Sequence, residues 1–401
     1  MVRSKYPMIP VEEARRIVLD HVSVRAAGEV SFQEALGRVL AEDVDATEDM
    51  PPFAASAKDG FAVRAADGLA PRRLLGEQHA GVVTDLRVEP GTAVRITTGA
   101  PVPPGADAVV MVEYTDVDDG VVMIHKAVRP RDDVRPAGQD IARGQRVLTA
   151  GTPIGPPEIG LLAAVGRVRV SVHPPPRVAV MSTGDELVEP RETPGPSQIR
   201  DSNRYTLAAA ARRAGAEVVD LGHAPDTVPA LTAQIRHGLA EADVVVTSGG
   251  VSMGELDLVK PLLEQIGTVH FGRVRIKPGK PVTFATVDGK PFLALPGFPV
   301  SSLVAFEVFV RPALRKMAGH SELFRPRRCA RLRHDVQHAA DRPEFQRAVV
   351  EWEGNRLLAS TTGFQGSGRL LSLVGANALL ALPEGPEDFR AGDEVEALLL
   401  G

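Results

Sequence analysis

The hydrophobic residues between positions 177 and 319 predict strands and helices in alternation. Short continuous apolar runs, typical of strands buried on both faces, occur at 177–181, 217–221, 244–246 and 291–295. Segments with apolar residues at helical spacing follow them, at 208–214, 228–240, 256–266 and 300–317. Because parallel strands need helical crossovers, this alternation predicts a doubly wound α/β domain with a mostly parallel sheet.

The flanking regions predict smaller modules. An amphipathic helix is expected at 10–20, and the capping box Ser31-Phe-Gln-Glu34 begins a second helix. After Pro51, β-type runs joined by Pro-Gly and Asp-Asp-Gly turns indicate a small β domain, with strands at 93–97, 108–112 and 121–125. A helix at 159–165 and the stiff linker Pro174-Pro-Pro176 come next. Strands at 328–335, 345–351, 378–382 and 394–399 indicate a C-terminal β barrel.

Acidic residues follow the predicted parallel strands at the ends where open α/β sheets bind ligands. They are Asp185, Glu186, Asp226, Glu255 and Asp257. The strand at 244–246 also leads into Gly249-Gly250, which can adopt positive φ and bring backbone amides close to an anion. Gathered carboxylates repel an anion unless a cation lies between them, so a Mg²⁺-bridged phosphate site is one interpretation. Helix N-caps are the alternative for each acid taken singly.

Basic residues alternate with apolar ones directly before a Pro-Gly turn. This pattern predicts that Arg273, Arg275 and Lys277 share one face of a strand and that Lys280 projects from the turn. Directed at the acidic edge, the two lysines would neutralise phosphate. A solvated face of the sheet is the alternative. The turn Pro296-Gly297, which opens the last helix, is a further position suited to an anion.

Ordered motifs run through most of the chain. In the α/β region they are 182–187 (STGDEL), 201–203 (DSN), 248–252 (SGGVS), 277–281 (KPGKP) and 295–297 (LPG). Outside it they are 56–63 (SAKDGFAV), 95–103 (RITTGAPVP), 105–109 (GADAV), 135–140 (RPAGQD), 342–347 (RPEFQR), 365–367 (QGS) and 376–377 (AN). Together they resemble the MoeA-type molybdopterin molybdenumtransferases and the gephyrin E domain.

The resemblance implies a multidomain α/β and β protein. A discontinuous N-terminal linker and dimerisation domain would comprise residues 1–50 and 139–176, with a small β domain, 51–138, inserted into it. The molybdopterin-binding α/β domain would span 177–322 and the C-terminal β barrel 323–401. Two subunits would form an elongated homodimer with active sites shared between them.

The resemblance also implies a reaction. The family inserts molybdate into adenylylated molybdopterin and releases AMP, with Mg²⁺ as cofactor, in molybdenum cofactor biosynthesis. A molybdopterin adenylyltransferase and acceptor molybdoenzymes are the expected partners.

The site residues are carried over from the matching motifs. The catalytic set is Asp59, Asp140, Glu186, Asp226, Asp257, Lys277 and Lys280, of which Glu186, Asp226 and Asp257 are the expected metal ligands. The substrate-binding set is Thr98, Arg135, Ser182, Thr183, Gly184, Ser248, Gly249, Gly250, Ser252, Pro296, Gly297 and Ser367.

Four positions depart from the family pattern. Lys58 stands where Met is common, Ala54-Ala55 replace an acidic-amide pair, and Phe298 replaces the Asn of Leu-Pro-Gly-Asn-Pro. Because Phe offers no hydrogen bond, the ligand contact implied at position 298 is in doubt.

Composition agrees with a globular protein of more than one domain, with 401 residues, 44% hydrophobic and 24% charged. The net charge of −5 argues against a nucleic-acid surface, and no apolar run is long enough to span a membrane. The single Cys329 excludes an intramolecular disulfide and is expected to be buried. The histidines show no metal-ligand spacing, although His334 and His338 are expected in one strand. A cytoplasmic location is the default expectation.

Two other functions are compatible with the α/β motifs. A binding or scaffolding protein would keep the fold without catalysis, but it would have no reason to keep mutually repelling charges in a cleft. A molybdopterin adenylyltransferase would need only about the central α/β region, so the motifs at both ends favour the molybdenumtransferase.

Overall fold

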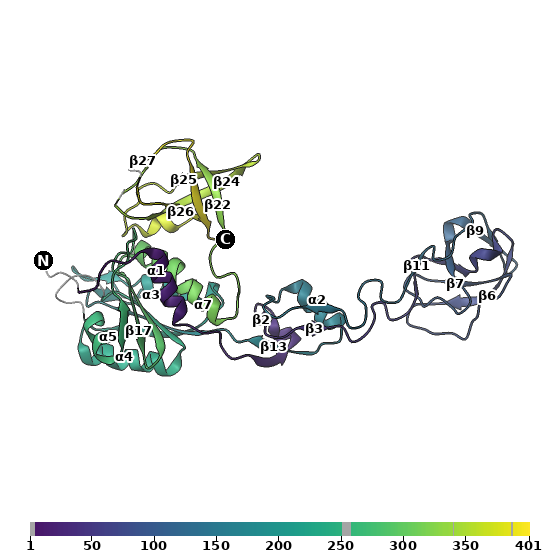
Figure 1. The fold of residues 1–401 in the computed structure, drawn as a ribbon, viewed down its shortest axis with the longest axis horizontal. Coiled ribbons are helices and arrows are strands. Elements are labelled where there is room, and N and C mark those ends of the chain that lie inside the picture. Colours follow the sequence, from purple (N-terminus) through teal and green to yellow (C-terminus); the bar gives the residue numbers. More distant parts are fainter. Residues whose placement is uncertain (1–4, 251–257, 340, 386–387) are drawn as a thin grey trace. The chain divides into compact units, whose positions relative to one another are not determined.

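The computed structural model describes residues 5–250, 258–339, 341–385 and 388–401. The chain divides into two compact units (Figure 1). The large unit comprises residues 1–29, 37–41 and 171–401, and the small unit comprises residues 30–36 and 42–170. The division into four domains stays a prediction.

A six-stranded sheet forms the centre of the large unit. In spatial order its strands are β17 (Glu217–Ala224), β14 (Arg177–Thr183), β18 (Val244–Ser248), β21 (Lys290–Leu295), β20 (Thr283–Val287) and β19 (Thr268–Phe271). The first four are parallel, which confirms the doubly wound prediction, and β20 and β19 add an antiparallel edge. The strand order reverses between β14 and β18, so a ligand crevice is expected at their carboxyl ends.

Helices pack on both faces of this sheet. They are α1 (Val11–Asp20), α3 (Asn203–Arg213), α4 (Val228–Glu241), α5 (Val259–Ile266), α6 (Pro299–Ala305), the π-helical turn η4 (Phe306–Val310) and α7 (Arg311–Met317). Because side chains alternate along a strand, Val180 and Val246 join the core that contains α1, α3 and α6. Ala179 and Val245 join the core that contains α4 and α5.

The predicted basic strand before the Pro-Gly turn is wrong. Strand β19 ends at Phe271, and only isolated bridges follow, at Val274 and Lys277. The alternation is nevertheless real, because Val274 and Ile276 are buried. Pro278 has no amide with which to continue a ladder, so the segment packs its apolar side chains without entering the sheet.

A closed five-stranded barrel forms the C-terminal part of the large unit. Its strands in order are β22 (Arg327–Leu332), β25 (Arg356–Thr361), β24 (Glu344–Glu353), β26 (Ala378–Leu382) and β28 (Glu394–Leu399). The sequence predicted all of these except β25. Shorter elements are β15 (Leu187–Val188), β16 (Ile199–Arg200), β2 (Val39–Leu40), β23 (Val336–Gln337), β27 (Asp388–Phe389) and the 3₁₀ turn η5 (Leu370–Leu373).

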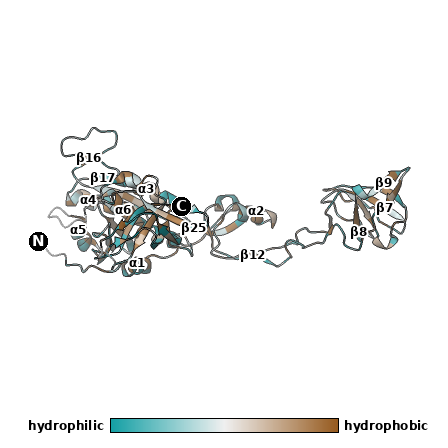
Figure 2. Ribbon diagram, turned by 90° about the horizontal axis from the view of Figure 1, so that it is seen from above, coloured by the Kyte–Doolittle hydropathy of each residue, from teal (hydrophilic) through white to brown (hydrophobic). Residues whose placement is uncertain are grey.

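The small unit is built on a six-stranded sheet. Its strands in order are β8 (Ala108–Met111), β5 (Gly60–Val63), β7 (Thr92–Ile96), β6 (Arg72–Gln78), β10 (Val121–Ile124) and β9 (Thr115–Asp118). Both faces of the sheet are covered, because Phe61 and Val110 enter one core while Ala62 and Val109 enter another. Hydrophobic residues of these strands are brown in Figure 2. This agrees with the small β domain predicted from the turns.

Short elements complete the small unit and the segments next to it. They are β1 (Gly28–Ser31), η1 (Phe32–Ala35), β3 (Val44–Asp45), β4 (Ala55–Ser56), η2 (Ala65–Asp67), η3 (Val112–Tyr114), β11 (Val134–Arg135), β12 (Arg146–Leu148), α2 (Pro156–Ala164) and β13 (Arg169–His173). The capping box at Ser31 and Glu34 is present, but it begins a four-residue 3₁₀ turn and not the full helix that was predicted.

Two other expectations fail for clear reasons. Cys329 is exposed and not buried, because Ala330 and Leu332 take the inward positions of β22. Its thiol donates a hydrogen bond of 3.3 Å to Glu394, which raises the pKa of Cys329. His334 and His338 do not share a strand, because His334 lies between β22 and β23 and His338 follows β23.

Within the described part of the chain, no helix has the length and apolarity needed to cross a membrane.

His320 gives the large unit a specific response to acid. Burial, together with Arg315 and Arg311, lowers the pKa of His320 from 6.5 to about 4. In the unfolded chain this histidine binds a proton below about pH 6.5, whereas in the folded chain it does so only below about pH 4. Stability from this residue is complete above pH 6.5 and is lost as the pH falls towards 4.

The unfolding free energy of the wild type falls between pH 7 and pH 4. We expect this fall to be about 1 kcal/mol smaller in His320→Asn, a value discounted for partial solvent exposure. Urea unfolding at several pH values measures this, with His237→Asn on the exposed face of α4 as control. Equal acid sensitivity of both variants and the wild type would contradict the assignment.

Candidate active site

Carboxylates gather where β14 and β17 end. The Thr183 hydroxyl donates a short hydrogen bond to Asp226, and the backbone amide of Asp226 donates to Asp185 over 3.0 Å. The Glu186 carboxylate folds back over Gly184, where a Cβ would come 2.5 Å from its Oε2 atom. Gly184 also has a φ of 143°, so no larger residue suits this position. Asp185, Asp226 and Glu186 thus lie on two adjacent loops at the predicted edge of the sheet.

The glycine pair after β18 has the predicted backbone conformation. Gly249 and Gly250 have φ values of 96° and 67°. A Cβ on Gly249 would clash with the Thr183 carbonyl oxygen, and one on Gly250 would clash with Val259. Only glycine lets this loop pass so close to the end of β14. The predicted residues Ser252 and Asp257, with Glu255, lie outside the described residues.

Asn203 joins the loops that follow β18 and β21. Its side-chain amide donates to the Ser248 hydroxyl over 2.8 Å and to the Gly297 carbonyl over 2.7 Å. The Ser248 hydroxyl in turn donates to the Pro296 carbonyl over 3.3 Å. Asn203 therefore positions these two loops. It was not among the predicted site residues, although the motif at 201–203 contains it.

Arg204 is buried among carboxylates beneath the same edge. Its guanidinium contacts both Asp220 oxygens over 2.6 and 2.8 Å, Asp201 over 3.1 Å and Glu189 over 2.6 Å. Burial by itself would lower the pKa of Arg204, but hydrogen bonds to Asp220 and Asp201 raise it above its usual value. Asp201 also accepts a 2.5 Å hydrogen bond from Ser182, whose side chain is fully buried.

A loop of the barrel borders the site at the start of α6. The Ser367 carbonyl accepts the backbone amide of Val300 over 3.0 Å, so this amide of the helix N-terminus already has a partner. Arg347, fully buried in β24, donates to the carbonyls of residues 364, 365 and 366. Burial lowers the pKa of Arg347 to about 10. Arg347 therefore fixes the loop that carries Ser367.

The basic residues before the Pro-Gly turn face acids of the barrel. The Lys277 ammonium lies 3.1 and 3.2 Å from the carboxylate oxygens of Glu344, which is almost fully buried. Arg275 forms a short ion pair with Glu384. Lys277 thus has a partner other than the acids at the end of β14. The Lys280 carbonyl accepts the Val274 amide over 3.0 Å, and the lysine side chain is partly exposed.

The small unit contains the other four predicted residues. The Asp59 carboxylate accepts the backbone amide of Thr98 over 2.7 Å, and both residues are exposed. Arg135 and Asp140 line a cavity of about 560 Å³ together with residues 47–52 and 163–166. The structure therefore groups these four residues in two pairs.

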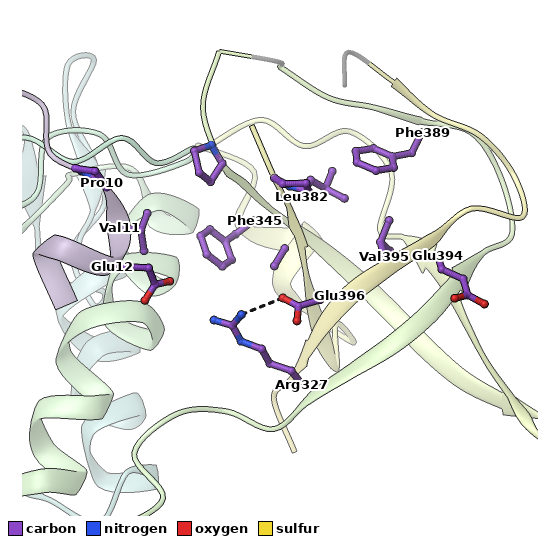
Figure 3. Close-up of a pocket in the computed structure, with 13 residues that line it drawn as sticks. Pro10, Val11, Glu12, Arg327, Phe345, Leu382, Phe389, Glu394, Val395 and Glu396 are labelled. Atoms are coloured by element: carbon purple, nitrogen blue, oxygen red, sulfur yellow. Dashed lines mark hydrogen bonds and ion pairs between the residues drawn. The ribbon is translucent and has the colours of Figure 1, made fainter. Parts of the chain in front are cut away.

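A second cavity, of about 570 Å³, lies between the start of α1 and the barrel (Figure 3). Phe345, Leu382 and Val395 form its apolar wall, and Arg327 pairs with Glu396 over 2.9 Å at its side. No predicted site residue lines it.

The chain is similar to known proteins over most of its length. Three family models match in succession, the MoeA N-terminal region (domains I and II) at residues 9–166, a probable molybdopterin-binding domain at 179–316 and the MoeA C-terminal region (domain IV) at 329–400. The molybdopterin molybdenumtransferase 2 of Mycobacterium tuberculosis is 38% identical, over 97% of this chain and 99% of that protein. The chain belongs to the MoeA family of molybdopterin molybdenumtransferases.

Other relatives give the same result. A gephyrin of Dictyostelium discoideum is 39% identical over 99% of this chain, which spans 63% of that longer protein. The crystal structure of a MoeA protein from Pyrococcus horikoshii matches with a TM-score of 0.84 and 34% identity, over 98% of this chain and all of that one. The resemblance and the predicted fold class are therefore confirmed, and the family belongs to molybdenum cofactor biosynthesis.

The donor chemistry of this MoeA-family site suits a hard divalent cation. Glu186 and Asp226 supply carboxylate oxygens, which Mg²⁺ prefers, and both lie at the rim of the crevice. Among the described residues, no group of three or more His, Cys, Asp or Glu side chains is placed to hold a metal ion. The third expected ligand, Asp257, is outside that part of the chain.

Removing the Arg204 guanidinium should destabilise the large unit. We expect Arg204→Met to lower the unfolding free energy by about 3–5 kcal/mol, because it leaves buried Asp201 without its cation. Urea unfolding of the full chain measures the change. Arg212→Met, at the exposed end of the same helix, is the matched control and should change stability by less than about 0.5 kcal/mol. Similar values for both variants would refute a structural role for the cluster.

Proposed function

We propose that this chain is a Mg²⁺-dependent molybdopterin molybdenumtransferase that inserts molybdate into adenylylated molybdopterin and releases AMP. The observation that carries the proposal is the group formed by Asp185, Glu186 and Asp226 at the reversal point of the sheet, beside the Gly249-Gly250 loop. Carboxylates next to an anion-binding backbone need a cation between them and the phosphate. A molybdopterin adenylyltransferase would supply the substrate, and molybdoenzymes would receive the product.

The expected ligands of Mg²⁺ are Glu186, Asp226 and Asp257. When bound, the metal offsets negative charge on the phosphate oxygens and on the departing AMP. Thr183 holds Asp226 by its hydroxyl and Asp185 holds the backbone of the same residue, so this carboxylate is oriented before substrate arrives.

The remaining groups bind and orient the substrate. The glycine loop allows the backbone to approach the pyrophosphate closely. Lys280 supplies a positive charge for phosphate or for molybdate. Lys277, held by Glu344, adds positive charge while linking the site to the barrel.

The direct test is an assay of the purified full chain with adenylylated molybdopterin, Mg²⁺ and molybdate. We expect AMP release that depends on both molybdate and Mg²⁺. AMP release independent of molybdate, or none at all, would overturn the proposed transferase activity. Formation of adenylylated molybdopterin from ATP would instead favour an adenylyltransferase.

Neutralising the rim carboxylates should impair turnover without unfolding the chain. We expect Glu186→Gln and Asp226→Asn each to lower kcat/KM on the order of 100-fold, because each removes charge that acts in the transition state. Glu192→Gln, an exposed acid beyond β15, is the matched control and should keep wild-type activity. Melting temperatures should stay close to wild type, since Glu186 is exposed and Asp226 only partly buried. Wild-type turnover in both variants would exclude these roles.

The predicted residues are divided between the two units, with Asp59 in the small unit and Asp226 in the large one. The family resemblance implies that each active site draws on two subunits. We therefore expect complementation when inactive Asp59→Ala chains are mixed with inactive Asp226→Ala chains. Hybrid dimers would contain one intact site of two, which restores part of the AMP release.

Subunit exchange must first be shown by co-purification of differently tagged chains. Mixing two preparations of the same variant is the control for nonspecific recovery. With exchange complete, activity no higher than that of each variant alone would mean that one chain supplies every residue of a site.

A further inference from the structure

Two exposed phenylalanines flank Ser367. Phe298 at the start of α6 is 62% exposed and Phe364 in the barrel loop is 72% exposed. The Phe298 ring lies against Gly368, where a Cβ would be 3.5 Å from its Cδ1 atom. The Phe364 ring lies over Gly366, where a Cβ would come 2.5 Å from its Cε1 atom. Both rings are thus supported by glycines of one short loop, on either side of Ser367.

The support of these rings is rigid. Arg347 donates to three consecutive carbonyls of the loop, including those of Phe364 and Gly366. The Ser367 carbonyl is fixed by the Val300 amide, two residues after Phe298. Gly297, the neighbour of Phe298, is held by Asn203, which also holds Ser248 at the end of β18. Phe298 is therefore fastened to the same loops that border the carboxylates.

Exposed aromatic rings on a fixed support have a clear chemical use. A phenyl ring in water lacks the favourable free energy that burial of its apolar surface would give. Neither ring belongs to the hydrophobic cores of the large unit. An aromatic face held in place stacks well on planar heteroaromatic rings, and such stacking tolerates different heterocycles.

We propose that Phe298 and Phe364 form an aromatic platform that binds a planar heterocycle of the substrate. The inference rests on the proposed function, whose substrate carries two such rings, adenine and pterin. Phe298 takes the position where the family commonly has Asn, so this chain replaces a polar contact with a stacking surface. These two residues determine substrate affinity and take no part in the chemical step.

Steady-state kinetics of AMP release test the platform. We expect Phe298→Ala and Phe364→Ala each to raise KM roughly tenfold with kcat little changed, which is the range for loss of one stacked ring. Phe298→Tyr keeps the ring and should retain wild-type KM, whereas Phe298→Asn should behave like Phe298→Ala. Trp352→Ala is the matched control, because Trp352 is an exposed aromatic, 67% accessible, in the β24–β25 hairpin outside this loop. It should leave KM unchanged.

Equilibrium binding identifies the heterocycle and does not require turnover. AMP and, separately, free pterin are titrated into the wild type and into Phe298→Ala, with pterin fluorescence and calorimetry as readouts. Weaker binding of only one probe by Phe298→Ala assigns the platform to that ring, and weaker binding of both assigns it to planar heterocycles in general. Equal binding of both probes by wild type and Phe298→Ala overturns the inference, as does a loss of kcat at constant KM.

The experiments distinguish a failure of the proposed function from a failure of the aromatic platform. A wild-type chain that binds pterin or AMP through Phe298 but releases no AMP in the presence of molybdate would refute the transferase activity and keep the platform. The opposite result would be molybdate-dependent AMP release by the wild type with unchanged kinetics in all Phe298 and Phe364 variants. It would support the transferase activity and refute the platform.

Discussion

The buried Arg204 guanidinium is the interaction on which the site end of the large unit depends. Its partners come from three places, Glu189 after β15, Asp201 before α3 and Asp220 within β17. The Arg204 and Asp201 side chains are only 5% and 2% exposed, so removing either one would leave the other charged in a low-dielectric environment. This requirement fixes the start of α3 against the sheet. Asn203 is thereby placed to hold the loops after β18 and β21.

The barrel is joined to the α/β part by polar contacts at the same edge. Lys277 pairs with buried Glu344, whose carboxylate also contacts the His338 ring over 3.1 Å and accepts the Ala339 amide over 3.1 Å. Ser367 accepts the Val300 amide, and Arg347 orders the loop around Ser367. Because hydrogen bonds depend on direction, these contacts place the loop more narrowly than apolar packing would. The barrel thus supplies one wall of the candidate site as well as its own core.

The Phe298 ring is not part of the contacts that hold the loops around it. Asn203 joins the loops after β18 and β21 by its own hydrogen bonds, while Phe298 is 62% exposed beside them. An exposed ring at the start of a helix does not disturb the core, and the Val300 amide at this end of α6 is already paired with the Ser367 carbonyl. The surrounding loops therefore do not depend on the Phe298 ring for their arrangement.

Local patterns determined much of this protein from the sequence alone. Apolar runs and helical spacing between residues 177 and 319 gave the parallel strands and their helices, and the Gly249-Gly250 pair indicated a close backbone approach that the structure confirms. Acids at strand ends were expected at one edge, and Asp185, Glu186 and Asp226 lie on adjacent loops there. These features follow from chain geometry over a few residues, where side-chain alternation and allowed φ angles leave few options.

Only the tertiary structure decided which charged groups pair. The row Arg273, Arg275 and Lys277 predicted a basic strand face, with either the acidic edge or solvent opposite it, yet Lys277 pairs with Glu344, 67 residues further along the chain. The Arg204 cluster and the Arg347 loop likewise depend on partners about one secondary-structure element away, Asp220 and Gln365, which only the folded chain brings within reach. A charged side chain accepts any opposite charge that packing brings within reach. The choice therefore belongs to the fold as a whole, in which burial makes one pairing far more favourable than the others.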